Sequence, residues 1–271
     1  MKLYDCFIYF NEEHILDLRL NVLDKYVDKF VIAEATRDHS GKEKKLSFNL
    51  NNFQKFKDKI KYIVVDDIPV NVKSSKKGWA DNHMRDQHQR NALASGYIDC
   101  NEDDLIMISD VDEIPNPEKI KEFNAEKKYA CFIQKNFHLK INLLNVTENL
   151  WMGTKICKKK FLKSPQWLRN IKTAKPAFWK FYKPSQPQII NDGGWHFSFL
   201  RNAEEISEKI KTYSHMEYNK PEFTNVEKIQ ERIKNRTDIF DRNYKYEKIE
   251  LNHTFPKYIL DNEIKFRKWI I

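Results

Sequence analysis

The sequence predicts an α/β fold, in which a mostly parallel central sheet in the first half is followed by an α+β second half. Three observations support this prediction. Up to about residue 117, short apolar runs rich in β-branched and aromatic residues alternate with helical patterns or long polar crossovers. Each of these runs ends in acidic or amide residues, at the strand ends where parallel sheets bind ligands. Beyond residue 117, strand-like runs follow one another through short polar links with few helices.

The first half contains expected strands at residues 3–10, 30–33, 60–65 and 105–109. Helices are expected between them at residues 15–23, 48–57 and 80–95. Asn11 precedes the first helix and could cap it, while Gly96 follows the last helix and would end it. Because helices or long crossovers separate these strands, we expect them to pair in parallel.

The second half contains expected strands at residues 129–139, 155–162, 178–182 and 194–200, and closing helices at residues 202–213 and 226–234. No low-complexity linker and no internal repeat divides the chain. With 271 residues, the chain is long enough to bury a large core. We therefore expect one continuous domain over residues 1–271.

The composition is that of a folded globular protein with a basic surface. Hydrophobic residues make up 41% of the chain, and 48 basic against 39 acidic residues give a net charge of +9. The basic excess consists mainly of scattered lysines. It weakly favours phosphate-bearing ligands and does not predict binding to nucleic acid.

Cysteine usage and hydropathy indicate a soluble, cytoplasmic protein. The four cysteines are far apart and form no C-x-x-C pair, so neither a zinc ribbon nor a redox motif is predicted. Reduced, buried thiols of this kind are typical of the cytosol. No apolar run approaches the roughly 20 residues of a membrane span. Asp5 interrupts the first apolar run, so no signal-peptide core is predicted.

The first candidate site follows the strand at residues 105–109. This strand runs directly into Asp110, Asp112 and Glu113, and Pro115 stops it. Carboxylates so close together repel one another, which raises the pKa of at least one of them unless a cation lies between them. Such oxygen ligands favour Mg²⁺ or Mn²⁺ over zinc. The alternative is a polar turn in which Asp110 or Glu113 only caps the next element.

The other expected strands of the first half end in similar groups. Their ends read Asn11-Glu12, Glu34 and Asp66-Asp67. In a parallel sheet, these side chains would meet the acidic residues after position 109 at one edge. Four such endings in succession favour a binding site. The alternative is a solvated edge, because loops are generally polar.

The expected helix at residues 80–95 supplies cations. Arg85 and Gln89 are about one helical turn apart, and Arg90 follows directly. Guanidinium groups that face an acidic metal site are suited to hold a diphosphate between them and the metal. The alternative is a charged helix face that is simply solvated.

The second candidate site is Asp192-Gly193-Gly194-Trp195-His196. Paired glycines let the backbone approach a ligand or adopt positive φ. His196 could be a nitrogen ligand to a metal, and Asp192 could be a general base. The alternative is a core histidine between aromatic residues. The chain contains no G-x-S-x-G elbow, no G-x-G-x-x-G fingerprint and no P-loop.

Taken together, these residues resemble glycosyltransferase family 17, the family of the β-1,4-mannosyl-glycoprotein β-1,4-N-acetylglucosaminyltransferase that adds bisecting GlcNAc. The matching blocks lie between about residues 4 and 200 and are Asp5-Cys6-Phe7 with Asn11-Glu12, Phe30-Val31-Ile32-Ala33-Glu34 with Gly41-Lys42, Arg85-Asp86-Gln87 with Arg90-Asn91-Ala92-Leu93, Ser109-Asp110-Val111-Asp112-Glu113-Ile114-Pro115, and Gly193-Gly194-Trp195-His196. Asp-x-Asp alone is a weak motif, but five blocks in this order are specific.

The resemblance implies a GT-A-like fold and an inverting transferase. Such an enzyme would use Mn²⁺ or Mg²⁺ and move a sugar from UDP-GlcNAc, or a close relative, to a hydroxyl of a glycan or another acceptor. Residues 1–117 would bind the nucleotide, and residues 118–271 would form the acceptor-side half with the closing helices. The animal members are Golgi proteins with a membrane anchor and a stem. We expect neither here, so the acceptor need not be an N-glycan.

The resemblance also implies roles for individual residues. Asp110 would contact the ribose side, and Asp112 would contact the metal and the diphosphate. With the nitrogen ligand predicted from the residues themselves, the expected metal site consists of Asp112, Asp110 and His196. The base that takes the proton from the acceptor hydroxyl would be Asp192 or Glu113.

The remaining roles concern the nucleotide. Asn11, Glu12 and Glu34 would line the nucleoside pocket, and Arg85 and Arg90 would face the phosphates.

Two other classes of function stay open on the sequence alone. A metal-dependent phosphodiester hydrolase also needs clustered carboxylates, but it uses water and typically two metals about 4 Å apart. A non-catalytic nucleic-acid-binding module would explain the net charge of +9. Acid-rich strand ends would repel a polyanion, however, and no nucleic-acid recognition motif is present.

Overall fold

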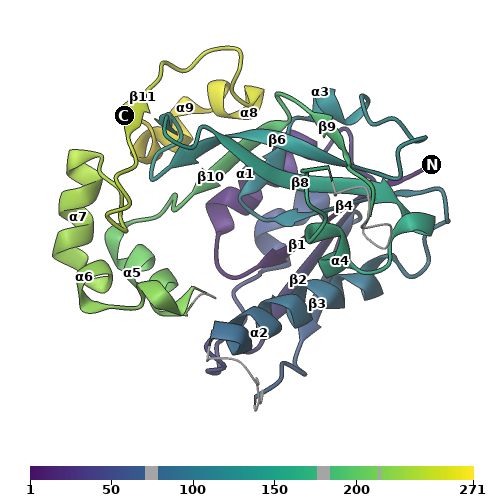
Figure 1. The fold of residues 1–271 in the computed structure, drawn as a ribbon, viewed down its shortest axis with the longest axis horizontal. Coiled ribbons are helices and arrows are strands. Elements are labelled where there is room, and N and C mark those ends of the chain that lie inside the picture. Colours follow the sequence, from purple (N-terminus) through teal and green to yellow (C-terminus); the bar gives the residue numbers. More distant parts are fainter. Residues whose placement is uncertain (71–78, 176–183, 213–214) are drawn as a thin grey trace.

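The computed structural model describes residues 1–70, 79–175, 184–212 and 215–271 (Figure 1). The strand expected at residues 178–182 lies outside these ranges. One mixed sheet runs through the molecule in the order β11-β7-β6-β8-β4-β1-β2-β3, and β5, β9 and β10 join it off this path.

The first half folds as a parallel unit. Its strands are β1 (Leu3–Tyr9), β2 (Lys29–Ala35), β3 (Ile60–Val65) and β4 (Leu105–Asp110). Its helices are α1 (Glu13–Leu23), η1 (Leu50–Phe56), α2 (Trp79–Ala92) and η2 (Leu93–Tyr97). β1 pairs with β2 and β4, and β2 pairs with β3, all in parallel. The expected strands are confirmed, but the cap expected from Asn11 is wrong, because Glu12 occupies the N-cap position and makes no side-chain cap.

The second half is antiparallel where it joins this unit. Its strands are β5 (Glu113–Pro115), β6 (Tyr129–His138), β7 (Leu143–Asn145), β8 (Leu150–Lys158), β9 (Gln188–Ile190), β10 (Gly194–Ser198) and β11 (Tyr246–Lys248). β8 pairs antiparallel with both β4 and β6, whereas β10 pairs parallel with β6. A mostly parallel sheet is therefore not confirmed. Short links join neighbouring strands here, and short links favour antiparallel pairing.

The helices of the second half are short. They are α3 (Pro117–Ile120), α4 (Pro165–Arg169), α5 (Ala203–Thr212), α6 (Pro221–Thr224), α7 (Val226–Asn235), α8 (Lys257–Leu260) and α9 (Glu263–Phe266). Figure 1 shows α5, α6 and α7 together at one side of the molecule. Across the described ranges, no helix has the length and apolar character needed to cross a membrane.

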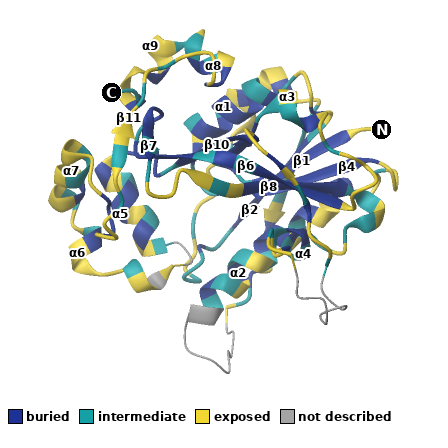
Figure 2. Ribbon diagram, turned by 45° about the horizontal axis from the view of Figure 1, so that its top comes forward, coloured by how far each residue is buried: buried dark blue, intermediate teal, exposed yellow. Residues whose placement is uncertain are grey.

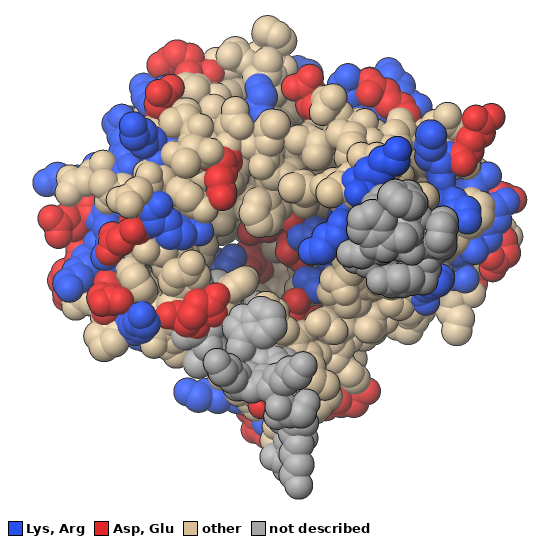
Figure 3. Space-filling view, in the orientation of Figure 1, with Lys and Arg blue, Asp and Glu red and all other residues tan. Residues whose placement is uncertain are grey.

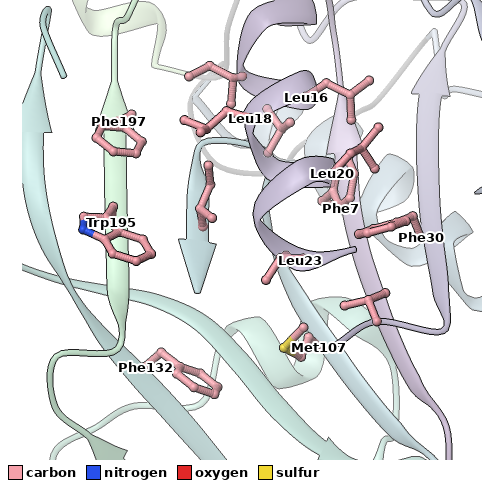
Figure 4. Close-up of a cluster of buried hydrophobic side chains, with 14 of the residues drawn as sticks. Phe7, Leu16, Leu18, Leu20, Leu23, Phe30, Met107, Phe132, Trp195 and Phe197 are labelled. Atoms are coloured by element: carbon pink, nitrogen blue, oxygen red, sulfur yellow. The ribbon is translucent and has the colours of Figure 1, made fainter. Parts of the chain in front are cut away.

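Alternate residues of the parallel strands feed two apolar clusters, because successive side chains point to opposite faces. Phe7 faces α1, and its neighbour Cys6 packs with Leu93 and Tyr97 of η2 on the other face. Figure 2 shows these central strands buried throughout. In Figure 4 the leucines of α1 lie between Phe7 and Phe30 on one side and Phe197 on the other. The first core thus extends across both halves of the chain.

Candidate active site

A cavity of about 650 Å³ lies between the two halves. Figure 3 shows a hollow with acidic and basic side chains on the face where α2, α4 and α5 lie in Figure 1. Among the residues predicted from the sequence, those that line the cavity are Glu12, Arg90, Asp110, Asp112 and His196. The cavity lining does not include Asn11, Glu34, Arg85, Glu113 or Asp192.

A buried arginine fixes the acidic turn after β4. Arg19 of α1 is fully buried and forms two hydrogen bonds to Asp5 of β1, of 2.7 and 2.6 Å. The same guanidinium donates to the backbone carbonyls of Asp110, Val111 and Glu113, at 3.0, 3.2 and 2.8 Å. One side chain thus satisfies three carbonyls of the turn, and the turn takes its shape from the Arg19–Asp5 pair.

Asp110 lies between two arginines. Arg90 of α2 donates to one carboxylate oxygen, and Arg169 of α4 donates to the other, both at 3.0 Å. Burial alone would raise the pKa of Asp110, but the two guanidinium charges hold it well below its usual range. Asp110 is therefore ionised, and both of its oxygens already accept hydrogen bonds from arginine.

Glu113 is 1% exposed and its carboxylate is also fully engaged. One oxygen accepts from the indole N–H of Trp151 at 2.6 Å and from Arg169, and the other accepts from Arg169 at 2.7 Å and from the backbone N–H of Asp110 at 3.1 Å. Glu113 therefore holds Arg169 and Trp151 in place.

The carboxylate of Asp112 faces the cavity and, within the described residues, accepts no hydrogen bond. Its nearest charged groups are the His196 ring nitrogen Nε2 and the Lys209 ammonium, each at 3.8 Å. Burial raises the pKa of Asp112. Lys209 and His196 lower it, and the charges of Asp110 and Glu113 raise it further, so that the pKa lies above its usual value. In the described part of the chain, no donor reaches this carboxylate within hydrogen-bonding distance.

The tautomer of His196 follows from Asn136 on the neighbouring strand β6. The amide nitrogen of Asn136 donates to the backbone carbonyl of Glu148 at 2.9 Å, so its oxygen faces His196 Nδ1 at 3.1 Å. Because this oxygen can only accept, Nδ1 carries the proton and Nε2 of the neutral ring presents a lone pair towards Asp112. Trp151 stacks on the same ring at a centroid distance of 4.4 Å.

This arrangement fits a metal ion that is shared with a ligand. The described residues contain no group of three or more His, Cys, Asp or Glu side chains that could hold a metal by themselves. Asp112 and His196 offer two lone-pair donors 3.8 Å apart. A histidine ligand commonly donates its other ring N–H to a fixed acceptor, as His196 does to Asn136. Mg²⁺ is often bound by one or two carboxylates together with substrate phosphates and water.

Glu12 lines the cavity beyond the end of β1. One of its oxygens lies 2.8 Å from the guanidinium of Arg201, and the other accepts the backbone N–H groups of Phe10 and Asn11 at 3.1 Å. The side chain of Asn11 also accepts from Arg201, at 2.5 Å. Burial alone would raise the pKa of Glu12, but Arg201, Lys209 and the backbone donors lower it to about 2.

We expect the ion pair of Glu12 with Arg201 to make the free energy of unfolding depend on pH. The unfolded pKa of a glutamate is about 4.3, so the ionised Glu12 stabilises the fold above that pH. This contribution is lost as pH falls towards the folded value of about 2. Urea unfolding of the wild type and Glu12→Gln should show a difference on the order of 3 kcal/mol at pH 7 that shrinks below about pH 4. A difference that stays constant over this range would contradict the pairing.

Glu34 and Arg85 organise loops beside the cavity. Glu34 is fully buried and accepts from the backbone N–H groups of Ser47 and Phe48, at 2.8 and 3.0 Å. Arg85 donates to the backbone carbonyls of His39, Pro69 and Val70, each at 3.0 Å. Both side chains therefore use their hydrogen-bonding groups on the protein itself.

The segment 192–196 meets the acidic turn through its backbone. Gly194 has φ of +134°, and a Cβ atom there would lie 2.2 Å from the carbonyl oxygen of Ile114 in β5. The glycine therefore permits the close pairing of β10 with β5, which brings His196 opposite Glu113. Asp192 is exposed, and its backbone carbonyl accepts from Asn116 at 3.3 Å.

Sequence reasoning missed four residues of the site: Arg19, Asn136, Arg169 and Lys209. Only Arg19 carries a usable signal, because Leu16 and Leu23, which lie about one helical turn before and after it, are core residues of the same helix. The others belong to β6, α4 and α5, whose approach to the turn depends on the path of the second half.

Comparison with known proteins supports the resemblance seen in the sequence. The family model for glycosyltransferase family 17 matches residues 1–268, which is nearly the whole chain. The comparison with curated proteins gave no match. The chain therefore belongs to glycosyltransferase family 17 and is an enzyme that transfers a sugar from a donor to an acceptor.

Proposed function

We propose that this enzyme is a metal-dependent, inverting glycosyltransferase of the GT-A type. It moves GlcNAc from UDP-GlcNAc, or a close relative, to a hydroxyl of a glycan or another acceptor, with Mn²⁺ or Mg²⁺. The observation that carries the proposal is the pair Asp112 and His196, with two lone-pair donors facing the cavity and the His196 tautomer held by Asn136. This pair suits a cation whose remaining ligands come from a diphosphate.

The cavity also suits a division of labour between the two halves of one domain. In this proposal residues 1–117 bind the nucleotide, and their contribution to the lining includes Ile8, Tyr9 and Phe10 at the end of β1. Residues 118–271 bind the acceptor, and their contribution includes Phe240 and Tyr244. The donor's anomeric carbon would lie between them, near Asp112.

The reaction would be a single displacement at the anomeric carbon. Asp112 and His196 would hold the metal, which would supply positive charge to the leaving diphosphate. Asp110, held by Arg90 and Arg169, accepts a hydroxyl of the ribose. Arg90 and Arg85 support the phosphate side through the side chains and loops that they hold.

The residues that bind the nucleoside differ from those that could take the proton from the acceptor hydroxyl. Glu12 lines the nucleoside side directly, while Asn11 and Glu34 act there through Arg201 and residues 47–48. Asp192 and Glu113 remain the predicted bases. Neither of them lines the cavity. Glu148 and Glu217 do line it and are exposed, so activity should be measured after replacing each of these four carboxylates by its amide.

A thermal-shift panel of nucleoside diphosphates and nucleotide sugars, with and without Mn²⁺, tests the proposed function. We expect UDP with Mn²⁺ to raise the melting temperature by more than the sum of the two separate shifts, because a metal held by Asp112 would attract the diphosphate. A ligand present at 100 times its Kd contributes about 2.7 kcal/mol. Equal shifts by UDP with and without Mn²⁺ would contradict a metal bridge.

The same panel separates the other two classes of function. A nucleic-acid-binding module would be stabilised by DNA or RNA with a steep dependence on salt. A phosphodiester hydrolase would release phosphate from simple diesters without an acceptor sugar. Transfer is shown directly by a sugar product that forms only when donor and acceptor are both present.

A further inference from the structure

The cations that line the cavity differ in what their donors already hold. In the described chain the Lys and Arg side chains in the lining are Arg90, Arg169, Lys209 and Arg242. Arg90 donates to Asp86, Asp110 and Gln166. Arg169 donates to Asp110 and Glu113, and Arg242 donates to Asp238 at 3.0 and 2.8 Å. Each of these three guanidinium groups is thus hydrogen-bonded to at least one carboxylate of the protein.

Lys209 is not committed in this way. Its ammonium lies 3.8 Å from a carboxylate oxygen of Asp112 and 3.8 Å from one of Glu12, which exceeds hydrogen-bonding distance in both cases. Glu12 has Arg201 at 2.8 Å as its closer cation, so the lysine is only its second charged neighbour. The ammonium also lies 5.3 Å from the centre of the Phe199 ring.

The position of Lys209 comes from the fold of the second half. α5 follows β10 after a short link, and its buried residues Ile206 and Ile210 pack into the third apolar cluster. This packing turns Lys209 towards the cavity and leaves its neighbour Lys211 exposed and outside the cavity lining. A lysine is a compact charge on a flexible stem, so the ammonium can move by a few ångströms without moving the helix.

We propose that Lys209 binds the diphosphate of the donor, and that in the free enzyme it neutralises Asp112 in place of the metal. This inference rests on the proposed function. Without a ligand, the ammonium beside Asp112 repels a divalent ion that approaches the same carboxylate. A diphosphate that enters the cavity takes the ammonium as a hydrogen-bonding partner and leaves Asp112 to the ion.

This exchange predicts opposite effects of one substitution on two ligands. Substituting a residue that merely supports the fold would weaken the binding of every ligand or of none. Lys209 should instead strengthen the binding of UDP with Mn²⁺ and weaken the binding of Mn²⁺ alone. The two effects share one cause, the competition of lysine and metal for Asp112.

Lys209→Met is the variant that tests the proposal, since methionine keeps an aliphatic chain against Phe199 and removes the charge. We expect the affinity for UDP in the presence of Mn²⁺ to fall roughly 10- to 100-fold, the range for a lost charged hydrogen bond. The affinity for uridine should stay unchanged. The affinity for Mn²⁺ without nucleotide should rise roughly three- to tenfold. Isothermal titration calorimetry measures all three constants on the full chain.

Lys211→Met is the matched control, because it removes the same charge from an exposed position on the same helix. It should change none of the three constants by more than about twofold. Lys209→Arg should recover most of the affinity for UDP with Mn²⁺. If Lys209→Met does not fold, Lys209→Gln is measured in the same way.

Two results would overturn the inference in different ways. If the wild type binds UDP with Mn²⁺ and Lys209→Met binds it equally well, Lys209 does not hold the diphosphate. If Lys209→Met weakens Mn²⁺ and uridine together with UDP, the lysine is only a structural residue. If the wild type binds no nucleoside diphosphate at all, the proposed function itself is wrong.

Discussion

Arg19→Met should leave the protein 3–5 kcal/mol less stable, or unfolded, which is the usual range for breaking a buried ion pair. The substitution leaves Asp5 fully buried without its ion-pair partner. It also removes the donor that serves the carbonyls of Asp110, Val111 and Glu113. Urea unfolding followed by far-UV circular dichroism measures the change.

Two control variants separate the effect of the unpaired buried charge from the effect of the lost contacts to the turn. Arg37 pairs with Glu43 at the surface, so Arg37→Met should cost less than about 1 kcal/mol. Replacing both partners of the buried pair, Arg19→Met with Asp5→Leu, should recover part of the stability. It should not recover binding of UDP with Mn²⁺, because the turn still lacks its donor. A stable Arg19→Met with normal nucleotide binding would show that the turn keeps its shape unaided.

Asp112→Asn should lower transfer activity by roughly 10²- to 10³-fold, the range for losing one group that stabilises developing charge. The fold should be as stable as the wild type or more stable. The pKa of Asp112 is raised by burial and by neighbouring acids, so its ionised form is disfavoured in the folded protein. A neutral amide relieves that cost at pH 7. Activity and unfolding measurements on the same preparation show both effects.

Asp110→Asn is the informative comparison, because Asp110 lies two residues before Asp112 and its substitution should lower the free energy of unfolding. The pKa of Asp110 is held low by Arg169 and Arg90 against the effect of burial, so its ionised form is favoured. Its amide variant removes one of the two carboxylates that each arginine contacts, since Arg90 keeps Asp86 and Arg169 keeps Glu113. The variant should therefore unfold more easily. An Asp112→Asn enzyme with full activity would show that the Asp-x-Asp assignment is wrong.

The sequence predicted the elements of the first half well because their pattern has one physical cause. Strands buried on both faces appear as short apolar runs, and β1, β2 and β4 are such runs. The sequence did not predict the direction of the strands after β4, because an apolar run looks the same whether its strand pairs in parallel or antiparallel. β8 returns antiparallel beside β4, which no residue of 150–158 signals on its own.

The candidate site was predicted in outline and not in its contacts. The endings of β1 and β4 were expected to meet, and Glu12, Asp110 and Asp112 do line one cavity. Glu34 and Arg85 carry the expected charges, but their partners are backbone groups of neighbouring loops. A side chain's partners depend on loops whose path is set by the whole fold, and spacing along the chain does not contain that information.

The cavity lining has a consequence for the time at which this enzyme becomes active. Its residues extend from Ile8 to Tyr244, so the chain must be synthesised at least as far as Tyr244 before the cavity can exist. Arg19 and Asp5 emerge early, yet the carbonyls that complete their network follow about ninety residues later. Lys209 comes later still. A growing chain therefore carries its acidic turn for many seconds before it can hold a donor, and synthesis itself delays catalysis until Tyr244 has left the ribosome.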